Sequence, residues 1–600
     1  MMKNRRDIDK KYKWDLSVIY PDEKSFLTEL DEARRLVETY PDHERTVTAS
    51  ARGLVSALSD MVRIEELIDK LWQYAHLTFS TDTSDNGAQA MSEKVKSLAA
   101  AAGAASWFVT PRLIALEPSV LDGWYKEEPR LLDFARLIEK NIRYKPYTLS
   151  DDAEKTVSRL EDFFGSARDV RTILSNSDIR FGTIRNSDGK REELTDTNYV
   201  PYLMSTDRRV RRSAFRKLYE TYKQFGNTYA TLFNAHVKER CTLAAVRGFK
   251  DSLTASTFAD EVTPDIYNNL IESVVSSLPA LYGYYELKRE VLGLKKLHLY
   301  DIYTPLISEL DREYTYEEAI DETLKTVGAF GEEYESTLRA GLTERGWVDV
   351  FPTRGKRGGA FSSGAPGTEP YILMNFTGTL DDIFTLAHEA GHSMHSYYSI
   401  KNNLPHNSSY TIFVAEVAST VNELLLAHRM INESKSDDEK LYILNQLMET
   451  YKGTLFRQTM FAEFERDMHA LCESGEPLTS KVICEQYFTI VKKYFGEDVV
   501  CDEQIACEWM RIPHFYTSFY VYKYATCISA ASAIVKRIET EGEEYVKKYI
   551  EFLKCGGSRS PLDSLKVAEI DMTDPHIVDG AIEDFVAACC QFKEIYAKKK

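Results

Sequence analysis

Apolar residues recur every three or four positions through much of this chain, and charged residues fill the opposite face of each segment. The pattern is clearest at residues 23–40, 51–77, 87–108 and 209–245. A period of 3.6 residues is typical of amphipathic α-helices, so each segment is predicted to be a helix with one buried face. Strands and helices do not alternate as they would around a parallel sheet. The chain is therefore predicted to be mostly α-helical.

Two regions depart from the helical pattern. Residues 358–364 and 370–378 read as two short strands around a Gly- and Pro-containing turn, which is a hairpin-like signal. Asn, Asp, Ser and Gly cluster at residues 175–201, where two further strand-like runs occur. We place a boundary there, between an N-terminal helical lobe at residues 1–195 and a larger lobe at residues 196–600.

The sequence His388-Glu389-Ala390-Gly391-His392 places two imidazoles four residues apart. Because an α-helix turns once in 3.6 residues, both rings project from one face and can hold one zinc ion. The acid beside the first histidine can reach a water on that ion, as in the H-E-x-x-H zinc peptidases. In a chain with 12 histidines among 600 residues, the motif is expected by chance on the order of a few hundredths of a time.

The motif is predicted to lie inside a helix, where its spacing has geometric meaning. Thr379 followed by Asp382 is the pattern of a helix N-cap with an acid at the third helical position. Beyond it, Ile383, Phe384 and Ala387 recur at helical spacing. The alternative is that the two histidines lie on a solvated helix face and bind no metal. A third ligand would exclude this alternative.

Glu416 is the predicted third ligand. A catalytic zinc site has three protein ligands and an open position for water. The metzincin pattern is excluded because His395 and Tyr398 stand where it requires Gly and His. Neither Asp nor Glu occurs between His392 and Ala415, so Glu416 is the first available acid.

Two further residues share a helix face with predicted ligands. His395 follows His392 by three residues, but three ligands on one straight helix would spread along about 10 Å of its axis. His395 is therefore predicted either to contact the ligand side chains without binding the metal or to pack in the core. Glu423 follows Glu416 by seven residues and could accept a hydrogen bond from the outer nitrogen of a ligating histidine, which would fix that ring. The alternative, to which we give equal weight, is that Glu423 is an exposed helix carboxylate with no contact to the site.

These residues resemble the active-site signature of the M3 family of metallopeptidases, in particular its oligoendopeptidase F branch. The similarity extends to residues 12–20, to residues 300–303 and to the tyrosine-rich run after Pro513, so it covers nearly the whole chain. The resemblance implies one zinc ion per chain, held by His388, His392 and Glu416, with Glu389 as the general base.

The resemblance also implies a mostly α, two-lobed zincin with a small β-sheet beside the motif helix and a deep substrate channel. The expected function is zinc-dependent hydrolysis of internal bonds in short oligopeptides. A zinc exopeptidase and a non-catalytic peptide-binding clamp are the alternatives. The clamp has no need for the general base Glu389, which argues against it.

Residues 511–524 contain the candidates for stabilising the oxyanion and binding substrate. We favour His514, Tyr520 and Tyr522 as catalytic groups, followed by Tyr516 as a substrate-binding residue, because related peptidases use a histidine and tyrosines from this region. The spacing between them does not decide which tyrosine acts. The alternative for each tyrosine is helix core.

The predicted hairpin supplies a second substrate-binding element. An edge strand beside the motif helix can bind a peptide backbone by strand addition, which gives affinity with little side-chain selectivity. Gly359, Ala360 and Phe361 are the predicted contact residues. The glycines do not form a phosphate-binding loop, because the required G-x-x-x-x-G-K-[ST] pattern does not occur.

Composition narrows the partners and the compartment. A net charge of -18 argues against nucleic acid and anionic membranes. We recognise no apolar run near the 18 or so residues of a membrane span and no signal peptide at the charged N-terminus. The 9 scattered cysteines indicate reduced thiols. A cytoplasmic enzyme without an obligatory protein partner is expected.

Overall fold

The computed structural model describes residues 3–160, 163–308, 310 and 312–599. The fold is mostly helical, with 73% of residues in helices and a few small sheets. Two compact units each gather three segments of chain. Unit 1 comprises Met1–Pro146, Asp311–Arg429 and Ile534–Ile570, and unit 2 comprises Tyr147–Leu310, Met430–Ala533 and Asp571–Lys600. This division differs from the predicted single boundary near residue 195, because the chain passes repeatedly between the units.

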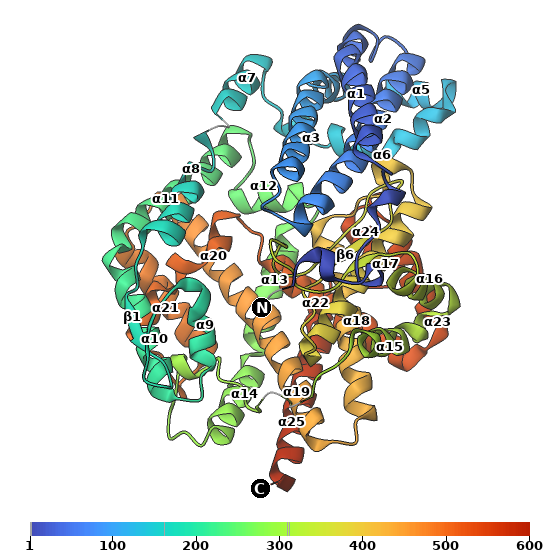
Figure 1. Ribbon diagram of the computed structural model, residues 1–600. Helices are drawn as coiled ribbons and strands as arrows, with labels where there is room; N and C mark the ends of the chain where they lie inside the picture. The colour runs from blue at the N-terminus through green and yellow to red at the C-terminus, as the bar shows by residue number, and fades with distance from the viewer. Residues whose placement is uncertain (1–2, 161–162, 309, 311, 600) are drawn as a thin grey trace. The chain divides into compact units, whose positions relative to one another are not determined.

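Unit 1 contains a helical N-terminal part and the helices and strands around the H-E-x-x-H motif (Figure 1). Its elements are α1 (Glu23–Thr39), α2 (Ala51–Thr81), α3 (Asn86–Ala105), α4 (Val109–Ala115), α5 (Pro118–Glu127), α6 (Ala135–Ile142), α15 (Tyr316–Val327), α16 (Glu332–Thr343), β4 (Val348–Asp349), β5 (Phe361–Ser363), β6 (Tyr371–Leu373), α17 (Leu380–Asn402), α23 (Glu543–Lys554) and α24 (Pro561–Val567). Two long helices begin in one unit and end in the other: α18 (Ile412–Glu433) and α22 (Tyr522–Glu541).

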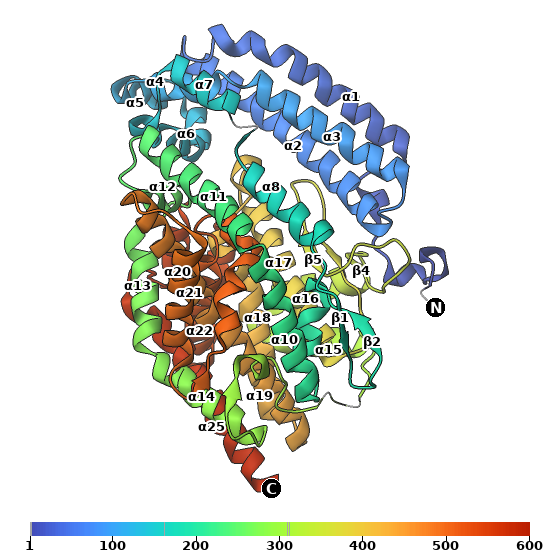
Figure 2. The ribbon, with the colours of Figure 1, turned by 90° about the vertical axis from the view of Figure 1, so that its left-hand side faces the viewer.

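Unit 2 is built of helices with two small two-stranded sheets. Its elements are α7 (Asp151–Leu160), α8 (Ser166–Ile173), β1 (Thr183–Arg185), β2 (Arg191–Glu193), α9 (Asp196–Met204), α10 (Arg208–Gln224), α11 (Gly226–Val246), α12 (Ser252–Ala259), α13 (Pro264–Ser276), α14 (Leu278–Val291), β3 (Leu297–His298), α19 (Asp437–Tyr451), α20 (Arg457–Glu473), α21 (Ser480–Phe495), β7 (Val499–Val500) and α25 (Asp579–Lys599). The antiparallel hairpin of β1 and β2 lies against α10 (Figure 2).

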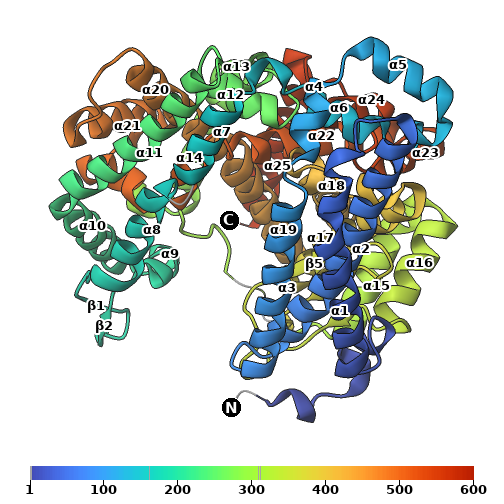
Figure 3. The same ribbon diagram turned by 90° about the horizontal axis from the view of Figure 1, so that it is seen from above.

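The predicted helices are confirmed, with one difference. The segments at residues 23–40, 51–77 and 87–108 correspond to α1, α2 and α3, which lie side by side (Figure 3). The predicted helix at 209–245 is two helices, α10 and α11, because the chain turns between Gln224 and Gly226. Phe225 has φ -100 and ψ 10, which lies outside the helical range.

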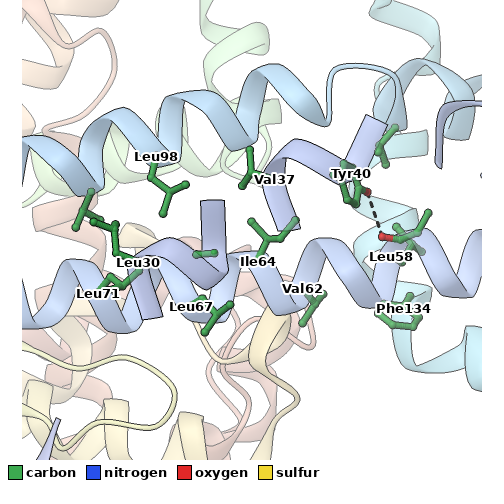
Figure 4. Packing of buried hydrophobic residues seen from close by; sticks show 14 of the residues in the cluster. Leu30, Val37, Tyr40, Leu58, Val62, Ile64, Leu67, Leu71, Leu98 and Phe134 are labelled. Atoms are coloured by element: carbon green, nitrogen blue, oxygen red, sulfur yellow. Dashed lines mark hydrogen bonds between the residues drawn. The ribbon is translucent and has the colours of Figure 1, made fainter. Parts of the chain in front are cut away.

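The helices α1 to α3 enclose the core of the N-terminal part of unit 1. Leu30, Val37, Leu67 and Leu71 interdigitate with Leu98 between the three helices (Figure 4). The Tyr40 hydroxyl is buried with its ring and donates to the carbonyl of Ala57 at 3.1 Å, so its burial leaves no unpaired polar group.

The predicted hairpin beside the motif helix is also confirmed. The strand β5 pairs antiparallel with β6, and β6 pairs parallel with β4, so β5 lies at one edge of a three-stranded sheet. Two helices hold this edge. Gln73 of α2 donates to the carbonyl of Ser363 at 2.6 Å, and the hydroxyls of Ser362 and Ser393 of α17 lie 2.8 Å apart.

One helical stretch, at residues 86–115, is long and apolar enough to cross a membrane when judged by length and composition alone. A single helix that passes this test is weak evidence for a membrane span, so our expectation stays a prediction. The stretch owes its hydropathy largely to a run of alanines, and 28% of its most apolar window is buried within the fold. The structure divides it into α3 and α4.

Candidate metal and catalytic site

The helix that carries the H-E-x-x-H motif begins where the sequence predicts. Thr379 is the N-cap of α17, and its hydroxyl accepts the backbone N–H of Asp382 at 3.2 Å. The Asp382 carboxylate in turn accepts the N–H of Thr379 at 2.9 Å, which completes the capping box. The predicted cap is therefore confirmed, and the motif lies about two turns into a regular helix.

Among the described residues, His388, His392 and Glu416 form a cluster that could hold a metal ion, which we call the metal-ligand cluster. The Nε2 atoms of the two histidines are 3.2 Å apart. Glu416 Oε2, on α18, lies 3.4 Å from His388 Nε2 and 3.3 Å from His392 Nε2. The three atoms thus converge from two helices onto a single point.

The shape of this triangle fits a zinc ion. Nitrogen and oxygen ligands bind zinc at about 2.0–2.2 Å, so two ligands at a tetrahedral angle lie roughly 3.3–3.5 Å from each other. The observed separations of 3.2–3.4 Å match that requirement. Two imidazoles and one carboxylate are also the donor set of catalytic zinc sites. These residues can hold the metal without rearranging.

Close packing of α17 against α18 brings the third ligand to the two histidines. A Cβ atom on Gly391 would lie 2.6 Å from the carbonyl oxygen of Ala418, so only glycine permits this approach. The Asn422 side chain ties the helices together by donating to the Ala387 carbonyl at 3.0 Å. On α18 itself, the Ser419 hydroxyl donates to Glu416 Oε2 at 3.1 Å.

The Glu389 side chain is buried beside the ligand cluster. The residue is 6% exposed, and among the described residues its Oε2 atom has no hydrogen-bond partner. Burial raises the pKa of Glu389, and the charges of His388 and His392 oppose that shift. For Glu416, burial favours the neutral form, but hydrogen bonds from the two histidines hold its pKa below the ordinary value.

Glu423 and His395 occupy different surroundings although both were predicted to support the ligands. Glu423 Oε1 lies 3.2 Å from His388 Nδ1, the ring atom that faces away from the cluster, although the ring is not turned for a linear hydrogen bond. His395 is 1% exposed and stacks on Tyr410 with ring centroids 3.7 Å apart. Burial lowers its pKa to about 3, so the ring is neutral and acts by packing.

The candidate residues of the 511–524 region belong to unit 2 and differ in exposure. His514, in a 3-10 turn (Pro513–Tyr516), lies near Tyr520 and Tyr524, with ring centroids 6.1 and 6.0 Å away. All three rings are half-buried. Burial lowers the pKa of His514, which favours its neutral form.

Tyr516 and Tyr522 are both in the core. Tyr516 is 2% exposed and packs against the ring of His236 at 5.4 Å. Tyr522 has 0% exposure, and its hydroxyl donates to Asp260 at 3.1 Å. Burial raises the pKa of Tyr522 well above its ordinary value, with the Asp260 charge adding to the shift.

The predicted substrate-binding residues lie at and before the sheet edge. Phe361 is the first residue of β5 and is half-buried against the ring of His76 of α2 at 5.3 Å. Gly359 has φ 79, and its carbonyl accepts the Asn375 side chain at 2.8 Å. Ala360 lies between them and is half-buried.

Sequence reasoning missed Gly391, Ser419 and Tyr524. A glycine inside a strongly helical motif costs stability, so its presence was a signal of close helix packing. The spacing of Tyr520 and Tyr524 is one helical turn, which was a signal that their rings could meet. Nothing in the spacing of Ser419 and Glu416 distinguished their hydrogen bond from an ordinary helix contact.

The comparison with known proteins decides the family. The family model described as Peptidase family M3 matches residues 202–583, and the one described as Oligopeptidase F matches residues 112–181. The chain belongs to peptidase family M3. The resemblance drawn from the motif residues is thereby confirmed.

Several oligopeptidases are similar to the chain over nearly its whole length. Oligopeptidase PepF of Bacillus subtilis (strain 168) is 38% identical and aligns with 100% of this chain and 89% of its own. Group B oligopeptidase PepB of Streptococcus agalactiae is 34% identical over 100% of this chain and 99% of its own. The crystal structure of oligoendopeptidase-F from Enterococcus faecium superposes with a TM-score of 0.76 at 32% identity, covering 96% and 99% of the two chains.

Proposed function

We propose that this M3 peptidase is a zinc-dependent endopeptidase that hydrolyses internal bonds of short oligopeptides. Membership of a peptidase family supports peptide-bond hydrolysis, and the metal and the position of cleavage are our proposal. One observation carries it: His388, His392 and Glu416 present three donor atoms at the separations that a zinc ion requires, with the Glu389 carboxyl group buried beside them.

When bound by these residues, a zinc ion lowers the pKa of a coordinated water and polarises the scissile carbonyl. Glu389 takes the proton from the attacking water and passes it to the nitrogen of the leaving amine. Burial raises the pKa of Glu389 above its ordinary value, which makes its carboxylate a stronger proton acceptor. The Glu423 carboxylate, 3.2 Å from the outer nitrogen of His388, orients that ring through its charge.

Residues 511–524 supply the groups that we propose for the substrate and the oxyanion. Tyr520 is half-buried, so its hydroxyl can donate to the developing oxyanion. Neutral His514, beside it, donates to a substrate carbonyl. Tyr522 is the weaker candidate, since its hydroxyl already donates to Asp260. Tyr516, buried against His236, stays a prediction for substrate binding.

We further propose that the substrate binds as an added strand along β5, with Gly359, Ala360 and Phe361 as contact residues. The edge position of β5 and its packing against α17 support this mode. The enzyme then acts on unfolded oligopeptides in the cytoplasm.

The test is cleavage of an internally quenched peptide of roughly 8–12 residues with both ends blocked. We expect internal cleavage that stops after chelation and returns when zinc is restored, with products identified by mass spectrometry. A matched peptide with free ends distinguishes an endopeptidase from an exopeptidase, because an exopeptidase would cleave this peptide and leave the blocked one intact. Failure of a zinc-loaded, folded enzyme to cleave either peptide would overturn the proposal.

A further inference from the structure

The segment that carries His514 and Tyr520 contains a residue in a strained conformation. Phe519 has φ 55, in the left-handed region, where its Cβ atom crowds the backbone. Among the described residues, two other non-glycine residues have a positive φ, Glu261 and Glu569. Glu261 is half-buried and Glu569 is exposed, whereas Phe519 is only 1% exposed. A buried strained residue persists only if its surroundings hold it in place.

The Glu465 side chain of α20 holds the backbone of Phe519. Glu465 Oε1 accepts the Phe519 N–H at 2.7 Å. The residue is 1% exposed, and its Oε2 atom has no hydrogen-bond partner among the described residues. Burial raises the pKa of Glu465 to about 8, against the opposing effects of the Phe519 hydrogen bond and the Lys523 charge. A buried acid is costly, and its hydrogen bond goes to the strained residue.

The neighbours of Phe519 are held as well. The ring of Phe519 packs against His469, also on α20, with centroids 4.4 Å apart. The hydroxyl of Ser518, the preceding residue, lies 3.0 Å from His236 Nε2. Tyr520, the following residue, is half-buried and contacts the rings of His514 and Tyr524. Ser518 and Phe519 are therefore held in place, and the proposed oxyanion donor Tyr520 follows them directly.

We propose that Glu465 is a positioning residue for the peptidase reaction, which fixes the left-handed backbone of Phe519 and thereby directs the hydroxyl of Tyr520. A change in φ at Phe519 rotates all that follows it, so loss of the hydrogen bond displaces Tyr520 first. This inference rests on the proposed function of Tyr520. It assigns to α20 a role in catalysis without contact to the substrate.

The experiment compares two substitutions of Glu465 that differ in one property. Glu465→Gln keeps an oxygen that accepts the Phe519 N–H, and its kcat should stay within about twofold of the wild-type value. Glu465→Met has similar length without an acceptor, and its kcat should fall at least about tenfold with little change in KM. Equal loss in both variants, or a wild-type kcat in Glu465→Met, would overturn the proposal.

A double-mutant cycle tests whether the effect passes through Tyr520. If Glu465 acts by placing that hydroxyl, Glu465→Met should cost nothing further once Tyr520→Phe has removed it. Additive losses in the double variant would contradict the assignment. The control is Glu463→Met on the same helix, which removes the ion pair of a buried carboxylate with the partly exposed Lys493 at 2.7 Å and should lower stability while kcat is unchanged.

Hydrogen exchange at the Phe519 amide gives a readout that does not depend on turnover. The amide should be protected in the wild type and in Glu465→Gln, and should exchange faster in Glu465→Met. Unchanged protection of the Phe519 amide in Glu465→Met would refute the positioning role of Glu465. An inactive wild-type enzyme with this exchange pattern would instead overturn the proposed function, so the two failures are distinguishable.

Discussion

The metal-ligand cluster of unit 1 and the Pro513–Val521 segment of unit 2 place functional side chains in different ways. His388 and His392 come from one regular helix, and Glu416 comes from the next helix along the chain. His514 and Tyr520 lie instead in turns, on either side of residues held by side chains from distant helices. Helical spacing aligns the two histidines, and one contact between neighbouring helices adds Glu416, whereas the second set is aligned only by tertiary contacts with distant helices.

This difference has an energetic side. Each metal ligand sits in an ordinary helical backbone, so a correct geometry costs little conformational strain. The Pro513–Val521 segment contains left-handed Phe519, which requires the buried carboxyl group of Glu465 to hold it. We therefore expect substitutions in the cluster to act through metal and chemistry, and substitutions around the segment to act through placement.

The largest effect is expected from Glu389→Gln, which changes the chemistry of the cluster without changing its ligands. An amide cannot take the water proton, so kcat should fall by about 10³-fold or more. The zinc content should remain near one ion per chain, measured by atomic absorption. Retained turnover in this variant would refute Glu389 as the base, and loss of zinc would show that the two functions are not separable.

A matched pair of tyrosine variants tests the second region. Tyr520→Phe should lower kcat about 10²-fold, because it removes a donor to the oxyanion. Tyr522→Phe, two residues away, should leave kcat nearly unchanged and destabilise the fold by about 1 kcal/mol, since it breaks the hydrogen bond to Asp260. The reverse outcome in steady-state kinetics would make Tyr522 the oxyanion donor.

Much of the first region was predictable from sequence. The capping box at Thr379 and Asp382, the helix that follows it and the hairpin of β5 and β6 all occur as the sequence predicts. The division into units was not predictable, because contacts between segments hundreds of residues apart decide it. The sequence left core burial open for every tyrosine of residues 511–524 and did not single out Tyr522, for the same reason. Its partner Asp260 lies 262 positions earlier in the chain.

Glu423→Ala tests whether the cluster depends on groups outside its ligands. Without Glu423, the ring of His388 loses the charge that faces its outer nitrogen, and zinc affinity should fall about 10–100-fold. Competition with a chromogenic chelator measures this. Glu433→Ala, at the exposed end of the same helix, is the control and should bind zinc as the wild type does. An unchanged affinity in Glu423→Ala would restrict the cluster to its three ligands.

Gly391→Ala sharpens the comparison at the point where the cluster itself depends on packing. The added methyl group would lie 2.6 Å from the Ala418 carbonyl oxygen, so α17 and α18 must separate slightly. Overpacking of this kind costs about 1–3 kcal/mol of folding stability, measurable by urea unfolding of the zinc-free enzyme. The same shift moves Glu416 away from His388 and His392, so zinc affinity should fall by about the same free energy.

The control is Gly103→Ala, which should have neither effect, because nothing lies within 4 Å of the added methyl group. If Gly391→Ala lost stability but kept its zinc affinity, the cluster would tolerate a small separation of the two helices.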